Sequence, residues 1–444
     1  MLDIGFWLLY ITTPIITIIL LRAAGERITK ISIVNVTVIA LIMFSILGTF
    51  PLFYFLDEYR YSIGVNDQTI VLKVLFYSSI NIFVFILGVI FTRKVFGIRP
   101  IEFDSSEIKM LSQIQWLALI TIFFLCVIVL LLYLQQIDRV AIFITFTESI
   151  SDAKAARSDM GNSFAGKYHW YKLFMHDIGK LVTFSVYAHW LITKNRLALI
   201  GFISSLIYSL FVAIMATEKG PAAWLLIGLF MVYFLVNRNG SIPFRKIVPF
   251  ILFLLGGLIL GYIFFMGSDN VFSAIGAIFS RAFSGSISPA YYYLEFFPAH
   301  QEFLLGRTFP NPGGILPYEP YLYTIEVMNW KFPYHLELGI VGTMPTVFWG
   351  EAYANFGVAG IPIIAFIMGC IVSIVSYVVS KLEINPLSIG FYVWLILMFK
   401  NLANTGFSGY FYNVYILFVS MLVLGVLAIR GYLRVRRKRS HRIV

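Results

Sequence analysis

The sequence predicts an all-α, polytopic integral membrane protein. Hydrophobic residues make up 59% of the 444 residues and charged residues only 12%, whereas soluble domains are about 45–50% apolar and about 25% charged. Long apolar runs recur along the whole chain, and they are roughly twice the length of a barrel strand, without its alternating polarity. Because the backbone in lipid must satisfy its own hydrogen bonds, we expect these runs to be helices.

We expect about eleven membrane spans within a single transmembrane domain, 1–444. The ninth is too long for one straight helix, so we expect a short interfacial piece over 346–358, a break near Gly357 and Gly360, and a full span from Ala359. The apolar start of the chain is long enough to span, which favours a first transmembrane helix over a cleaved signal. The expected spans are 2–21, 31–56, 70–91, 110–134, 172–192, 197–216, 222–237, 247–266, 346–380, 385–400 and 412–430.

The distribution of basic residues predicts the orientation. If the loop 22–30 is cytoplasmic, then 20 of the 33 Lys and Arg residues fall in the short cytoplasmic segments. This pattern follows the positive-inside rule, with the N-terminus outside and the C-terminus in the cytoplasm. The basic tail 431–444 suits anchoring to anionic membrane lipids rather than nucleic acid. We take a bacterial inner membrane as the default location.

Two external loops are long, 135–171 and 267–345, and long loops in a compact architecture are usually functional. Four of the basic residues in or beside external segments are candidates for binding an anion, because the positive-inside rule makes Lys and Arg unfavourable there. One explanation is snorkelling or a solvated loop. The other is a shared anion such as a pyrophosphate, since Arg and Lys bind phosphate oxygens. These residues are Arg157, Lys219, Arg281 and Arg307.

Known catalytic motifs are missing from the sequence. It contains no Walker A loop, HExxH motif, nucleophile elbow or zinc pattern. No Asp-x-Asp pair is placed to hold a divalent metal against a pyrophosphate, so we expect neither a metal nor a cofactor. Cys126 and Cys370 lie inside apolar runs and do not indicate a disulfide framework.

One glutamate interrupts the long apolar stretch that contains "GEAYANFGVAG". Between Glu337 and Lys381, Glu351 is the sole Asp, Glu, Lys or Arg. A carboxylate at membrane depth costs about 2.5–3.5 kcal/mol on insertion scales, so it should face protein or a water-filled cavity. Asn355 follows one turn later on the same face. Either Glu351 pairs with an Arg and holds the helix, or it acts as a catalytic base or orients substrate hydroxyls.

Several aromatic and histidine residues are candidates for contact with a glycan. Tyr292 lies in "AYYYLEFF", and Tyr353 lies beside Glu351. Tyrosines suit both the membrane interface and stacking on sugar rings. His300 and His335 lie in the second long loop, where a histidine is either a base near neutral pH or structural.

The stretch "GEAYANFGVAGIPI", which follows a large external loop, resembles bacterial oligosaccharide repeat-unit polymerases (the Wzy class). "VAIMATEKGPAAWLLIGLFMVYFL" is similar to that family's pair of helices joined by a tight external turn with a basic residue. "FSRAFSGS" places an Arg at the start of the large loop. The resemblance covers roughly 200–430. The sequence departs from the family in one respect. Some members have an Arg followed by ten residues and a Gly, but here the positions eleven after Arg157, Arg281 and Arg307 (168, 292 and 318) are all Tyr.

The resemblance implies a GT-C-type fold and an inverting, metal-independent glycosyltransferase. Such enzymes join oligosaccharides carried on undecaprenyl pyrophosphate at the outer face of the inner membrane, into O-antigen, capsule or exopolysaccharide. It implies that Arg281, Lys219 and Arg157 bind pyrophosphate and that Glu351 receives the hydroxyl proton. It also implies a chain-length-regulating partner.

Three other functions remain open from the residues. The nearest is a ligase of the same superfamily. Such ligases tend to have a key histidine in the large loop, where His300 and His335 lie. A flippase or transporter would need polar residues inside the membrane. A non-enzymatic scaffold is the third. The candidates for a transport path are Asp177, Lys180, His189 and Lys400.

Overall fold

In the computed structural model the protein is all-helical, as the sequence predicts. The structure describes residues 1–444 apart from 101–102, 162–163, 165–167, 267–269, 335–341 and 441–444, and none of the described residues lies in a β-strand. Eleven helices among them are long and apolar enough to cross a membrane. The chain is therefore a multi-pass membrane protein.

Ten of these eleven helices overlap expected spans, and two differences stand out. The segment expected to span at 172–192 is divided into α9 (Tyr168–Lys172), a π-helical segment η2 (Leu173–Ile178) and α10 (Gly179–Thr193). These pieces follow one another without a gap over Tyr168–Thr193, but this run is not among the helices that are both long and apolar enough to count as candidate spans. Conversely, Val271–Phe296 qualifies as a span, although the sequence analysis places it in the second external loop.

The contacts of the chain group into two compact units, which are described separately. Unit 1 comprises Met1–Ile101, Ile275–Ser380 and Met398–Asn413. Unit 2 comprises Glu102–Ala274, Lys381–Leu397 and Val414–Val444.

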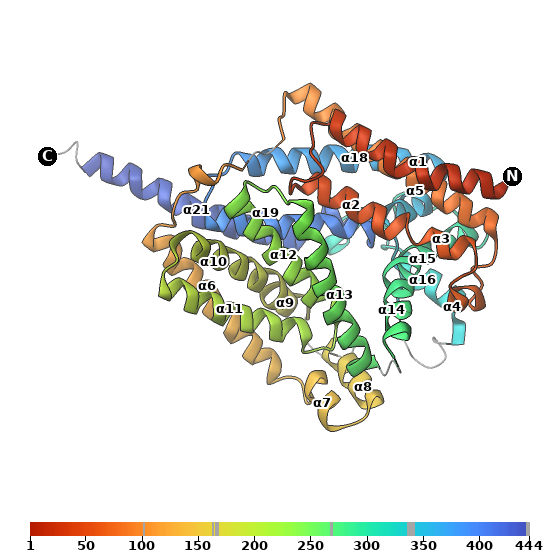
Figure 1. Ribbon diagram of the computed structural model, residues 1–444, viewed down its shortest axis with the longest axis horizontal. Coiled ribbons are helices and arrows are strands. Elements are labelled where there is room, and N and C mark those ends of the chain that lie inside the picture. Colours follow the sequence, from red (N-terminus) through yellow and green to blue (C-terminus); the bar gives the residue numbers. More distant parts are fainter. Residues whose placement is uncertain (101–102, 162–163, 165–167, 267–269, 335–341, 441–444) are drawn as a thin grey trace. The chain divides into compact units, whose positions relative to one another are not determined.

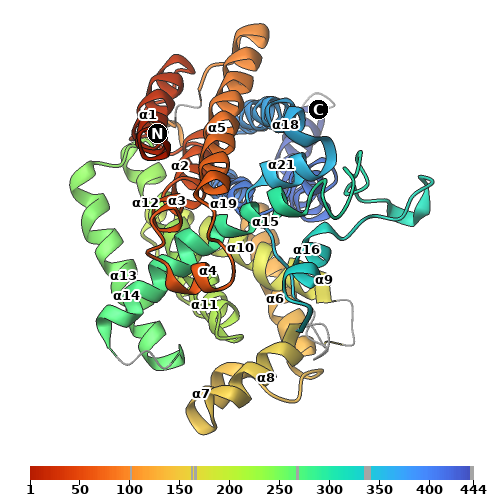
Figure 2. The same ribbon diagram turned by 90° about the vertical axis from the view of Figure 1, so that its right-hand side faces the viewer.

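Unit 1 is built around α5, which packs against α18, α1, α2, α3 and α15. Figure 1 draws α1, α5 and α18 in the same part of unit 1, and Figure 2 shows α5 between α1 and α18. The helices of this unit are α1 (Leu2–Ala23), α2 (Ile33–Ser45), α3 (Thr49–Phe53), α4 (Glu58–Ser62), α5 (Gln68–Phe96), most of α14 (Val271–Phe279), the π-helical η3 (Ser280–Ser284), α15 (Gly285–Phe296), η4 (Pro312–Gly314), α16 (Tyr323–Lys331), α18 (Phe348–Ser380), η5 (Lys400–Ala403) and α20 (Ser408–Phe411).

Helix α18 is not straight. Gly357 has non-helical angles, φ 63° and ψ −155°, so α18 is a short first segment followed by a long one. A positive φ is cheap only for glycine, and the break expected near Gly357 is confirmed. Further along, Gly369 lies against the carbonyl of Phe85 on α5, and Gly88 lies against the carbonyl of Phe366. Small residues at both sides of this crossing let the two backbones approach closely.

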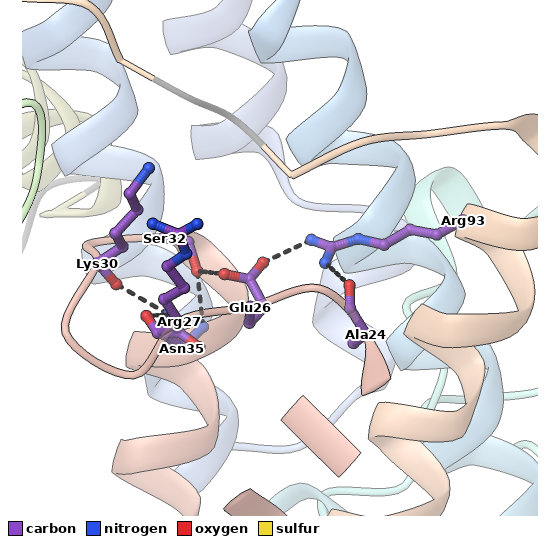
Figure 3. Close-up of polar contacts among 7 residues, drawn as sticks. All are labelled: Ala24, Glu26, Arg27, Lys30, Ser32, Asn35 and Arg93. Carbon is purple, nitrogen blue, oxygen red and sulfur yellow. Dashed lines mark hydrogen bonds and ion pairs between the residues drawn. The ribbon is translucent and has the colours of Figure 1, made fainter. Parts of the chain in front are cut away.

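A buried ion pair lies at the C-terminal end of α5. Arg93 Nη2 donates to Glu26 Oε1 at 2.6 Å and Nη1 donates to the Ala24 carbonyl at 2.6 Å. Ser32 donates to the second Glu26 oxygen at 2.9 Å and also caps α2 by accepting from Asn35 N. Figure 3 shows these side chains converging on the α1–α2 connection. Because both charges are buried and paired, they fix this connection to α5.

Unit 2 centres on α10, which packs against α11, α12 and α6. Helix α6 begins with a capping box between Ser112 and Gln115. The short helices α7 and α8 pack together, as Figure 2 shows. The remaining helices of this unit are η1 (Ser105–Glu107), α6 (Gln113–Leu134), α7 (Ala141–Thr147), α8 (Ile150–Gly161), α11 (Arg196–Ile214), α12 (Lys219–Arg238), α13 (Phe244–Met266), most of α19 (Pro386–Phe399) and α21 (Val414–Ser440).

Candidate functional site

Glu351 lies in the first turn of α18 and is only 1% exposed. Its Oε2 atom accepts a hydrogen bond from the backbone N–H of Ser408 at 3.0 Å. Its Oε1 atom is buried and has no hydrogen-bond partner among the described residues. A helix N-terminus favours a negative charge, but it leaves this oxygen unused.

The sequence left open that Glu351 pairs with an Arg. Of the ion pairs between described residues, none includes Glu351. A buried carboxylate is normally paired or fully hydrogen-bonded. The site therefore holds a carboxylate with one free oxygen and no neighbouring cation in the described part of the chain.

Tyr323, the first residue of α16, brings a phenol to this carboxylate. A Cβ atom at Gly406 would collide with both the Tyr323 hydroxyl and Glu351 Oε2, so these groups lie side by side over the glycine. Burial, and then the negative charge of Glu351, raise the pKa of Tyr323 well above its usual value. Tyr323 therefore keeps its proton as a donor beside the carboxylate. Tyr293 of α15 lies edge-on to it, with ring centroids 5.9 Å apart.

A chain segment around Thr308 closes the site from another direction. The Asn355 amide donates to Thr308 Oγ1 at 2.8 Å, and its oxygen accepts from the Gly306 N–H at 2.9 Å. Ser408 Oγ donates to the Thr308 carbonyl at 3.3 Å. Asn355 thus shares the face of Glu351, as expected, but its side chain holds the segment 304–308 in place.

The expected anion-binding residues are divided between the two units. In unit 1, Arg281 is exposed on the π-helical η3, and Arg307 is exposed with its guanidinium carbon 5.6 Å from the centroid of the Tyr321 ring. In unit 2, Arg157 pairs with Glu218 at 3.0 Å, and both side chains are more than 40% exposed. Lys219 begins α12, and its side chain lies outside the described part of the structure.

The glycan-contacting candidates lie in unit 1, and two have their hydroxyls engaged. Tyr353 donates to the Phe297 carbonyl at 3.1 Å, and Tyr292 donates to the Ile63 carbonyl at 3.1 Å. His300 is exposed, and its ring centroid lies 4.9 Å from that of Trp330. His335 lies outside the described residues.

Unit 2 contains an apolar cavity of about 200 Å³. Glu218, the partner of Arg157, forms part of its wall. Hydrocarbon side chains from α7, α11, α12 and α13 form most of the rest, so the cavity fits an alkyl or prenyl chain better than a polar ligand. They include Ile142, Ile214, Leu226, Leu254 and Leu258.

The candidates for a transport path have local partners. Asp177 accepts from Trp394 Nε1 at 3.2 Å, and it forms no ion pair with Lys180 in the described structure. His189 lies on Trp116, with ring centroids 4.6 Å apart, and Lys400 donates to Asn401 at 2.5 Å. These contacts involve Asp177, His189 and Lys400, and they do not mark a path.

Sequence reasoning finds Glu351 but misses the groups that surround it. Tyr323, Thr308, Gly406 and Ser408 are common residue types in loops, and no spacing links them to position 351. Among the described residues, no three His, Cys, Asp or Glu side chains are grouped as metal ligands. Searches against protein-family models, curated proteins and solved structures found no match to this chain.

The arrangement has a definite chemical capacity. A carboxylate with one free oxygen can take a proton from a hydroxyl that reaches hydrogen-bonding distance. The Tyr323 phenol beside it can donate to the carboxylate or to a bound hydroxyl. Because Glu351 is only 1% exposed, a substrate reaches Oε1 only after part of the surrounding structure moves.

Proposed function

We propose that this protein is a glycosyltransferase that polymerises oligosaccharide repeat units carried on undecaprenyl pyrophosphate. The observation that carries the proposal is the buried Glu351 carboxylate, which has one unpartnered oxygen and no counter-ion among the described residues. A merely structural carboxylate at this depth would be expected to have its oxygens satisfied. The likeness of its surrounding sequence to the repeat-unit polymerases adds the substrate class.

In the proposed reaction, a sugar hydroxyl of one lipid-linked unit attacks the anomeric carbon of another. The bond from that carbon to the pyrophosphate oxygen breaks, the new glycosidic bond forms, and the configuration inverts. The hydroxyl proton passes to Glu351 Oε1. Arg281 and Arg307 of unit 1, the unit that holds Glu351, would neutralise the leaving pyrophosphate. Arg157 and Lys219 of unit 2 stay predicted pyrophosphate-binding residues.

The cavity in unit 2 supports a lipid-linked substrate. It lies among membrane helices, is apolar, and borders the Arg157–Glu218 pair. A hydrocarbon chain in the cavity would place a phosphate near Arg157. The proposed location is the bacterial inner membrane, with the N-terminus outside, the C-terminus in the cytoplasm and the chemistry at the outer face. A chain-length-regulating protein is a proposed partner.

The test uses purified protein in liposomes with lipid-pyrophosphate-linked repeat units and no added metal. We expect a ladder of multimers from the wild type, its loss in Glu351→Gln and a strong reduction in Arg281→Ala. The matched control is Glu383→Gln. Glu383 is far from Glu351 in sequence, is partly exposed and forms an ion pair with Lys109. The control should keep the ladder.

Other products would identify other functions. Transfer of a preformed glycan to an added lipid or protein acceptor, without a ladder, would indicate a ligase. Substrate that becomes protected across the liposome membrane, without transfer, would indicate a flippase. A wild-type ladder that persists in Glu351→Gln would remove Glu351 from the chemistry.

A further inference from the structure

Two cations of unit 1 lie along α15, Lys331 at the ring of Tyr292 and Arg60 beside Gly285. The ammonium of Lys331, at the end of α16, lies 4.6 Å from the centroid of the Tyr292 ring and 5.8 Å from that of Trp330. The charge of Arg60, on α4, acts on the Tyr292 hydroxyl. Both residues lie outside the candidate membrane spans.

The donors of these two cations are unused within the described structure. A Lys ammonium carries three donors and an Arg guanidinium five. No described carboxylate forms an ion pair with either, and Arg60 Nε is buried without a partner. Arg93 also has a buried Nε without a partner, but it differs from Arg60 in that both of its terminal nitrogens donate at 2.6 Å. Arg60 and Lys331 thus have charged donors that no described acceptor uses, and these donors could bind an anion.

The nearby acids do not fill this role. Asp57 already accepts from Ser280 Oγ at 2.7 Å and from the Arg60 backbone N–H at 3.2 Å. Glu295 acts on Lys331 electrostatically but is not within ion-pair distance of it.

Glycines leave room for both charged groups. A Cβ atom at Gly64 would lie 2.6 Å from Lys331 Nζ, and one at Gly285 would lie 2.8 Å from Arg60 Nη2. The backbone at these positions therefore admits the cations beside Tyr292.

Aromatic rings surround the same place. The Trp330 ring lies 4.9 Å from His300 and 5.4 Å from Phe296, centroid to centroid. An aromatic face offers an apolar surface to the C–H face of a sugar ring, while Lys and Arg bind carboxylate oxygens.

We propose that Arg60 and Lys331 bind the carboxylate of an acidic sugar, whose ring packs on Trp330 and His300. This assignment rests on the proposed function and makes a glycan with a uronic-acid-type residue the preferred substrate. Tyr323 and Lys331 are eight residues apart on α16, about 12 Å along its axis. The acidic sugar is therefore held at a fixed distance from the sugar hydroxyl that gives its proton to Glu351. This distance selects which repeat unit binds and which of its hydroxyls reacts.

The test measures binding to full-length protein in lipid nanodiscs by tryptophan fluorescence. The probes are a galacturonate oligosaccharide, a neutral galactose oligosaccharide of the same length, and inorganic pyrophosphate. We expect the acidic oligosaccharide to bind the wild type more tightly than the neutral one. Lys331→Met and Arg60→Met should each weaken this binding about tenfold, the loss of one charge-assisted hydrogen bond.

Lys194→Met is the matched control, because the Lys194 ammonium lies 4.9 Å from the centroid of the Trp190 ring in the same cation–π arrangement. It should leave binding unchanged. If Arg60→Met does not fold, judged by circular dichroism, Lys331→Met decides.

Equal binding of acidic and neutral probes, or variants that bind like the wild type, would overturn the proposal. If pyrophosphate competes with the acidic oligosaccharide, and if pyrophosphate binding is weakened equally in both variants, the site is a phosphate site instead. Because binding needs no turnover, a failed binding test with an intact polymer ladder rejects the acidic-sugar site alone. A ladder that fails while binding persists rejects the polymerase alone.

Discussion

The backbone N–H of Ser408 donates to Glu351 Oε2 at 3.0 Å across 57 residues of sequence. This bond, together with the adjacent Gly406, holds one carboxylate oxygen and leaves the other unpartnered. The orientation of the proposed base therefore depends on a segment that sits in a different connection of the chain.

Gly406→Ala should abolish or strongly reduce glycan polymerisation. A Cβ atom at this position collides with Glu351 Oε2 and with the Tyr323 hydroxyl, so the carboxylate must turn away from its bound position. The matched control is Gly409→Ala, where a Cβ atom meets nothing within 4 Å. The liposome ladder assay compares the two, and equal activity of both variants would contradict this geometry.

Tyr323→Phe should change how stability depends on alkaline pH. Because the folded-state pKa of Tyr323 is raised, its contribution is fully present below the unfolded value of about 10 and is lost as the pH rises from there towards the folded value. The wild type should thus lose more thermal stability than Tyr323→Phe over this range. Parallel melting-temperature curves for the two proteins would contradict the shift.

Glu26→Gln should destabilise the protein, because it leaves the buried charge of Arg93 without its partner. Removing one member of a buried ion pair costs about 3–5 kcal/mol, and these side chains are only 7% and 3% exposed. The contrasting pair is Lys109–Glu383, which is more exposed. Glu383→Gln should cost no more than about 1 kcal/mol. Denaturant unfolding in detergent measures both, and similar losses would remove the special role of the Arg93 pair.

Gly369→Ala should also destabilise unit 1. The added methyl group meets the Phe85 carbonyl on α5, so the two helices must separate, and such overpacking typically costs about 1–3 kcal/mol. Gly256→Ala on α13 is the control, since a Cβ atom there meets nothing within 4 Å and alanine favours a helix by about 1 kcal/mol. The two variants should shift the melting temperature in opposite directions.

Much of the architecture follows from hydropathy. The eleven spans inferred from the sequence match the number of candidate spans among the described residues, and ten of them overlap in position. The exceptions have physical reasons. The run near 172–192 contains Lys172, Asp177 and Lys180, which lower its apolarity. The segment 271–296 contains Pro289 and several serines, which favour a loop in the sequence analysis.

The sequence by itself determined that this is a helical membrane protein, that α18 breaks at Gly357, and that Glu351 is an isolated acid within an apolar segment. Only the tertiary structure decided that Glu351 has no ion-pair partner among the described residues and lies beside Tyr323 and Ser408. It also decided that Lys331 lies at the Tyr292 ring and Arg60 beside Gly285 on the same helix. The reason is that apolarity is a local property of the chain, whereas these contacts join residues from distant connections, whose pairing depends on how the helices pack.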